Sequence, residues 1–102
     1  MNDNKIKAML AEDREEALIN AILQCTNKTE LRSFLKDICT PKELSALSER
    51  LLTARMLEHG GISYREISHL TGSSTTTIGR VARFLQQEPH KGYKLVLSRM
   101  SP

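Results

Sequence analysis

The sequence predicts an all-α protein, a six-helix chain that contains a helix-turn-helix. Its apolar residues recur at spacings of three and four, and no stretch alternates as a strand does. The aromatic residues are two Phe and two Tyr, with no Trp, so the core must consist of aliphatic side chains, which suit packing between helices. With 102 residues the chain has the length of one domain, and we expect 1–102 to form a single domain.

Two amphipathic helices are expected first. The range 5–25 carries acidic residues on one face and an apolar stripe on the other, made of Leu10, Ala17, Leu18, Ala21, Ile22 and Cys25. In the range 31–38 the spacing i, i+3, i+4, i+7 is filled by Leu31, Phe34, Leu35 and Ile38. Both patterns are typical of helices that pack by one face.

The third expected helix has strong start and stop signals. The run Thr40-Pro41-Lys42-Glu43 supplies an N-cap hydroxyl, a proline at the first helical position and a capping-box glutamate. Gly60-Gly61 ends the helix, as glycine commonly does just past a C-terminus. The inward positions are Leu44, Leu47, Leu51, Ala54 and Leu57. We expect this helix to be the central strut of the fold.

A helix-turn-helix is predicted over 63–86. A second capping box, Ser63 with Glu66, opens a two-turn helix that turns Ile67 and Leu70 inward. Gly72 lies in the turn between the two helices, where a positive φ is required. Ser73 and Ser74 supply N-cap hydroxyls for the recognition helix, about 74–86, whose inward residues are Ile78, Val81, Ala82 and Leu85.

The last helix is expected over about 91–100, after Pro89. Its inner face holds Tyr93, Val96, Leu97 and Met100. Together with the helices of 5–59, the segment 91–101 is predicted to form the core and the dimerisation surface, since so small an aliphatic core is marginal alone. A stable monomeric bundle is the alternative.

The charge asymmetry permits a polyanionic partner, and the sequence holds no catalytic constellation. Residues 60–102 hold six Lys/Arg and two Asp/Glu, a net of +4, whereas residues 1–59 have a net of −1. A polyanionic partner or a plain solvated basic face explains this asymmetry. The histidines His59, His69 and His90 are scattered, so no catalytic, metal or cofactor site is predicted.

The same sequence features predict a cytosolic protein with reduced thiols. No apolar segment approaches the ~18 residues that a membrane span needs. Cys25 and Cys39 have neither CxxC spacing nor a histidine cluster, and we expect them to be reduced core cysteines.

The candidate DNA contacts lie on the outward side of the helix-turn-helix. The recognition helix opens with hydroxyls and no negative charge, which suits phosphates and base edges. Gly79 either lets DNA approach closely or permits tight helix packing, and we favour the first. The predicted DNA-binding residues are Arg65, Ser73, Ser74, Thr75, Thr76, Thr77, Gly79, Arg80 and Arg83.

The stretch 40–85 resembles the tryptophan repressor family of bacterial regulators, and in particular its shorter repressor-like relatives. The residues that carry the resemblance are Thr40-Pro41-x-Glu43-x-x-Ala46-Leu47-x-x-Arg50, then Ser63-x-Arg65-Glu66-Ile67, then Gly72-x-x-x-x-Thr77-Ile78-x-Arg80. One residue fewer than the family pattern stands around 60–62. The resemblance implies an intertwined, all-helical homodimer. Each copy presents its helix-turn-helix, residues 63–86, as a DNA-reading head, and the two heads enter successive major grooves.

The resemblance also implies an altered effector pocket. The family holds tryptophan between two arginines that match Arg50 and Arg80, with Thr77 nearby. Where the family has a glycine this chain has Val81, and where it has a serine this chain has Phe84. Added bulk and lost polarity argue against tryptophan as co-repressor, so any small-molecule effector is unidentified. Our hypothesis is that Val81 and Phe84 fill the slot themselves.

The sequence therefore predicts a dimeric regulator, a repressor, that binds specific double-stranded DNA. The alternative is a helical protein–protein interaction module that keeps a helix-turn-helix as a docking surface.

Overall fold

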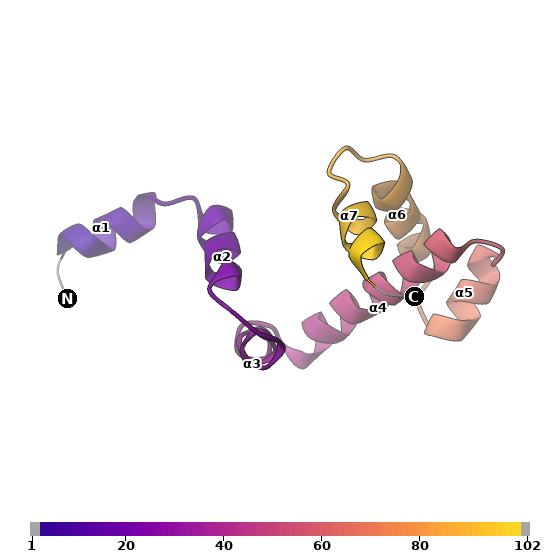
Figure 1. Ribbon diagram of the computed structural model, residues 1–102, viewed down its shortest axis with the longest axis horizontal. Helices are drawn as coiled ribbons and strands as arrows, with labels where there is room; N and C mark the ends of the chain where they lie inside the picture. The colour runs from indigo at the N-terminus through magenta and orange to yellow at the C-terminus, as the bar shows by residue number, and fades with distance from the viewer. Residues whose placement is uncertain (1–2, 101–102) are drawn as a thin grey trace. The chain divides into compact units, whose positions relative to one another are not determined.

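A computed structural model describes residues 3–100 as seven helices joined by short connections, with no strand in that range (Figure 1). This confirms the all-α class. The chain divides into two compact units, residues 1–41 and 42–102, which are taken in turn. That the whole chain is a single domain stays a prediction.

The first unit holds α1 (Asp3–Ala11), α2 (Arg14–Leu23) and α3 (Lys28–Ile38). The prediction of one unbroken helix over 5–25 is wrong, which raises the count from six helices to seven. Asp13 interrupts it: its backbone is extended and its carboxylate accepts a hydrogen bond from the Glu16 N–H at 2.9 Å. An aspartate that caps a new helix competes with continuing the old one.

A capping arrangement also fixes the start of α3. The Asn27 side chain accepts from the Glu30 N–H at 2.9 Å, and Glu30 Oε1 accepts from the Thr26 N–H and hydroxyl, each at 2.8 Å. The bond from the Thr26 backbone, followed by that from its hydroxyl, holds the pKa of Glu30 below its ordinary value. The ionised carboxylate therefore stabilises this cap near neutral pH, and the contribution is lost as pH falls through the lowered pKa.

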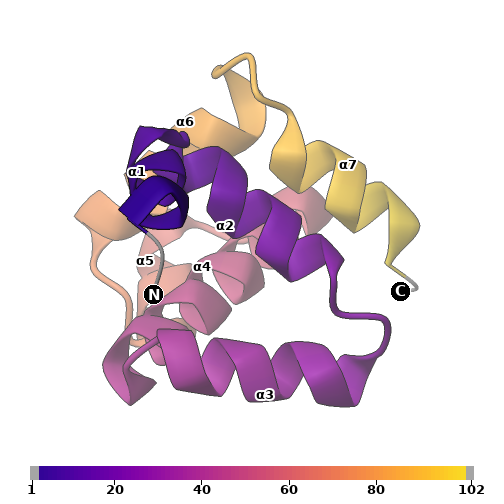
Figure 2. The same cartoon turned by 90° about the vertical axis from the view of Figure 1, so that its left-hand side faces the viewer.

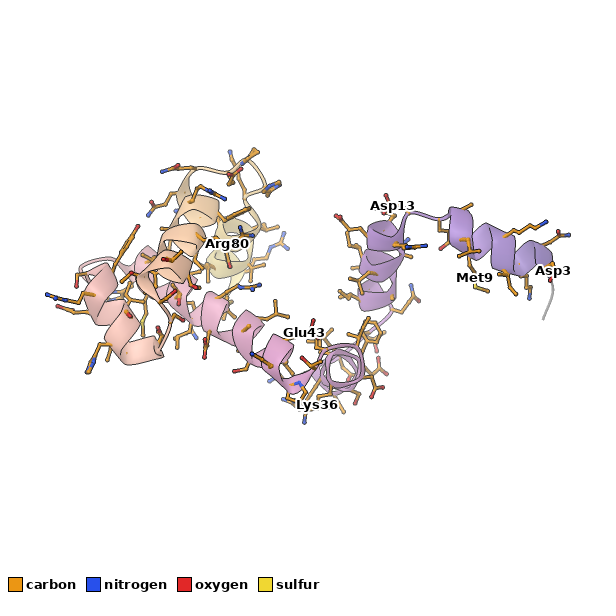
Figure 3. All side chains as sticks on the ribbon, turned by 180° about the vertical axis from the view of Figure 1, so that it is seen from behind. Asp3, Met9, Asp13, Lys36, Glu43 and Arg80 are labelled. Carbon is orange, nitrogen blue, oxygen red and sulfur yellow. The ribbon has the colours of Figure 1, made fainter. Side chains whose placement is uncertain are left out.

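The apolar side chains of the first unit have no core of their own. Among residues 3–41 none is buried (Figure 3, where Met9 of α1 is labelled). The large hydrophobic side chains left exposed there are Ile6, Met9, Leu10, Leu18, Ile19, Leu23 and Ile38. Cys25 and Cys39 are free thiols and only half-buried, so the expectation that they are core residues is wrong.

The second unit contains most of α4 (Pro41–His59), with α5 (Tyr64–Thr71), α6 (Thr75–Gln86) and α7 (Gly92–Arg99). The start and stop signals of α4 lie where the sequence predicted them. After His59 the chain turns through Gly60 and Gly61, whose φ values of 78° and 76° are left-handed and end the helix.

Three helices of this unit supply seven of the eight buried residues within 42–100, four of them from α6, and the eighth is Ser73 in the turn before α6. Thr53 and Ala54 of α4 and Ile67 of α5 join a buried face of α6 made of Ile78, Val81, Ala82 and Leu85. The α7 helix packs beside α6 (Figure 2). Lys94 Nζ of α7 also contacts both carboxylate oxygens of Glu58 on α4, at 2.9 and 3.2 Å. This exposed ion pair adds about 1 kcal/mol or less.

Several side chains predicted to face inward are exposed in the single chain. Leu70 is 63% exposed in the last turn of α5, and Val96 of α7 is 49% exposed, because no other helix of the second unit covers those sides. Leu47 of α4 and Met100 after α7 are exposed as well. The helical periodicity was predicted correctly, but the burial of these positions was not.

Candidate nucleic-acid interface

Local hydrogen bonds form the α5–turn–α6 segment as the sequence predicted. Ser63 Oγ accepts from the Glu66 N–H at 3.1 Å, and Ser74 Oγ accepts from the Thr77 N–H at 3.1 Å. Gly72 ends α5 with φ 79°, in the left-handed region that glycine adopts without strain. Both helix starts and the turn between them therefore follow directly from residue type.

Hydroxyl groups also hold the turn. Ser68 Oγ donates to the carbonyl oxygen of Ser73 at 2.6 Å. Thr71 Oγ1 donates to the Ile67 carbonyl at 2.7 Å and accepts from the Ser73 N–H at 3.1 Å. Sequence reasoning missed this network. The network fixes the geometry between the two helices with side-chain bonds rather than with flexible backbone.

The buried face of α6 decides which face points outward. Ile67 and Ile78 are 0% exposed, and Val81 and Leu85 are also buried. With 3.6 residues per turn, the opposite face of α6 carries residues 76, 79, 80 and 83. The outward side of the helix therefore carries four of the candidate DNA contacts, Thr76, Gly79, Arg80 and Arg83.

The first turn of α6 separates capping hydroxyls from outward ones. Ser74 Oγ and Thr77 Oγ1 bond to each other at 3.0 Å. Thr75 and Thr76 are exposed, and neither side chain has a hydrogen bond within residues 3–100. Ser73 is only 6% exposed, so we leave it out of the contact surface that we propose.

Gly79 lies on α6 one turn beyond Thr75, and the space beside it is open. A Cβ atom built on it would meet no atom within 4 Å, apart from its own helix backbone and chain neighbours. Tight packing against another helix of the second unit does not explain the glycine. Close approach of an external surface remains the functional interpretation.

The arginines of α6 gather around Phe84. The Arg80 guanidinium carbon lies 4.6 Å from the centroid of the Phe84 ring, and that of Arg83 lies 5.2 Å away (Figure 3 labels Arg80). Arg83 Nε also lies 3.4 Å from Glu88 Oε1. His90 stacks on the same ring, with centroids 6.0 Å apart and planes 12° apart. Sequence reasoning missed this cluster, although the i, i+4 spacing of Arg80 and Phe84 was visible.

Arg65 lies exposed in the first turn of α5, away from that cluster in sequence.

Across residues 3–100 no three His, Cys, Asp or Glu side chains are grouped so as to hold a metal ion. In the same range, no helix has both the length and the apolar character to cross a membrane.

Comparison with known proteins identifies the family. The family model described as Trp repressor protein matches residues 14–101. The chain belongs to the Trp repressor family. It is 39% identical over 85 residues to the protein YerC of Bacillus subtilis, a match that covers 83% of this chain and 80% of YerC. The crystal structure of a TrpR-like protein from Eubacterium eligens superposes with a TM-score of 0.77 at 35% identity, covering 93% of this chain and 99% of that one.

Membership in the Trp repressor family confirms the resemblance predicted from 40–85 and the all-α fold. The Trp repressor family is a family of regulators and is in general not one of enzymes. Both relatives come from bacteria.

The positions that the sequence predicted to correspond to an effector pocket include two bulky side chains. Val81 is buried in the core of the second unit, and Phe84 is half-buried beneath the two guanidinium groups. Arg50 lies exposed on α4, and Thr77 is half-buried and bonded to Ser74. The guanidinium of Arg80 thus already has an aromatic partner from its own helix.

Proposed function

We propose that this chain is a sequence-specific, double-stranded DNA-binding transcriptional regulator, a repressor, that inserts the recognition helix 74–86 into the major groove. The observation that carries the proposal is the outward face of α6, where Thr75 and Thr76 are exposed and Gly79 opens onto free space. This face stands on a turn fixed by hydrogen bonds, as a recognition element requires. Reading DNA inside a bacterium also makes the chain cytoplasmic.

The proposed contacts divide by position along α6. Thr75, Thr76 and Gly79 lie at its N-terminal end, the end of a recognition helix that meets base edges. We place the hydroxyls of Ser74 and Thr77, and the cations of the segment, against phosphates. These cations are Arg65, Arg80 and Arg83. Phosphate contacts fix the register on the duplex, and base contacts give the sequence preference.

We further propose that the chain acts as a homodimer. The first unit exposes an apolar residue set without a core, and the second unit has two apolar grooves, of about 650 and 420 Å³, along α4 and α7. A second copy supplies the same two features and buries both. Two heads would then recognise half-sites about one helical turn apart.

A charge on the apolar face of α2 is expected to abolish the dimer. Leu18→Asp puts a carboxylate where the second copy would bury an apolar side chain, so sedimentation should give the mass of one chain, against twice 11.5 kDa for the native protein. Asn20→Asp, on the other side of α2, is the matched control and should leave the dimer intact. A monomeric native protein would contradict the dimer proposal.

Tryptophan is expected not to bind in the manner of the family. We propose that Val81 and Phe84 fill the slot, so that the heads are competent for DNA without a ligand. Isothermal titration of the native protein with tryptophan should show no saturable heat. Stoichiometric binding with a micromolar Kd would contradict the filled-slot hypothesis.

Selection from a random pool of duplexes tests the function itself. We expect enrichment of paired half-sites without any added amino acid. If the pool stays random after repeated rounds, the DNA-binding proposal is wrong. The alternative function, a protein-docking module, is then favoured.

A further inference from the structure

Building on the proposed function, we infer that α6 selects its bases through the 5-methyl groups of thymine and not through guanine edges. Thr76 is the specificity-determining residue, and Thr75 lies beside it. The bound DNA site must therefore present thymine methyl groups to this surface.

The side chains near the base edges favour methyl recognition. Thr75 and Thr76 each end in a methyl group and a hydroxyl, and the threonine methyl group is one of the side-chain groups that pack on the thymine methyl. Their hydroxyls stay free because the cap of α6 is completed by Ser74 and Thr77 alone. The first turn of α6 holds no acidic residue, so no carboxylate is there to accept from cytosine N4.

The arginines that would read guanine are held elsewhere. Bidentate contact with guanine O6 and N7 needs a free guanidinium near the base edge. Arg80 and Arg83 lie one and two turns beyond Thr76, and both guanidinium groups lie against the Phe84 ring. Glu88 also pairs with Arg83. We therefore assign both cations to phosphates beside α6 and not to guanine edges.

Gly79 brings the methyl groups closer to the groove floor. It lies one turn after Thr75, and no side chain projects there to hold the duplex away. Threonine side chains are short, so they reach base edges only if the helix backbone comes near. The small residue and the short side chains therefore serve the same contact.

Base analogues in a selected duplex test the inference. Replacing a contacted thymine by deoxyuridine removes only the 5-methyl group, and it should weaken binding of the native protein about fourfold, the factor for one apolar carbon taken from a contact. Replacement in both half-sites should give roughly 15-fold. Replacing guanines by 7-deazaguanine, which lacks the N7 acceptor, should change binding by less than about twofold.

Thr76→Ser assigns the contact, because it removes the methyl group and keeps the hydroxyl. The variant should bind the thymine and deoxyuridine duplexes equally, at the affinity of the native protein for deoxyuridine. Thr26→Ser, the same change in an exposed linker residue, should behave as the native protein does.

Other outcomes overturn the inference in distinguishable ways. Sensitivity to 7-deazaguanine that Arg80→Ala abolishes, without sensitivity to deoxyuridine, would show guanine reading instead. Selected half-sites that lack thymine would also refute methyl recognition while leaving DNA binding intact. If no duplex is selected at all, the proposed function fails and this inference fails with it.

Discussion

Thr76→Asp is expected to weaken duplex binding by at least about 100-fold, since it puts a carboxylate where α6 would meet the negatively charged groove. Thr76 is exposed on the first turn of α6, and its side chain has no hydrogen bond within residues 3–100. An acidic residue in the first turn of a helix stabilises it by about 0.3–1 kcal/mol. The variant should therefore lose DNA binding, measured by fluorescence anisotropy, without losing thermal stability.

Ser45→Asp is the matched control for that substitution. It makes the same change of charge at an exposed position near the start of another helix, in the second turn of α4. The control should bind DNA within about threefold of the native protein, since only its long-range charge opposes the duplex. Native affinity in the Thr76→Asp variant, with the fold intact, would remove α6 from the interface.

Ile67→Ala is expected to lower the free energy of unfolding by about 2–5 kcal/mol. Ile67 is 0% exposed, and it is the one residue of α5 that is buried in the core shared with α6. Few buried residues support the head, so the cavity would remove a large share of its packing. Urea unfolding followed by circular dichroism measures the change.

Leu70→Ala tests whether the effect comes from burial and not from helix propensity. Leu70 lies on the same helix but is 63% exposed, so its replacement should change stability by no more than about 0.5 kcal/mol. Equal losses from the two substitutions would show that the buried core of the head is assigned incorrectly.

The local signals of this sequence predicted the reading head well. Ser63, Gly72 and Ser74 act through their own side chains or backbone freedom on neighbours within four residues. Such interactions depend on residue type and spacing alone. The buried positions of α6 follow equally from its 3.6-residue period, because one face of a short amphipathic helix must be covered.

Other features depend on competition or on a partner, and the sequence did not reveal them. Asp13 could have remained an exposed residue of a long helix, and its role as an N-cap depends on a small energy difference. The exposure of Leu18 and Leu70 depends on what surrounds a single chain. The cluster around Phe84 joins residues from α6 and the segment that follows it, so it required coordinates.

The dependence of duplex binding on salt tests the central proposal most directly. A dimer that holds phosphates through Arg65, Arg80 and Arg83 of each copy should release counterions, so log K should fall linearly and steeply with log salt concentration. Substituting one of these arginines in both copies should lower the slope by about two, one for each copy. An affinity that is unchanged by salt, or no binding to the selected duplex at low salt, would contradict the proposal that this chain reads DNA.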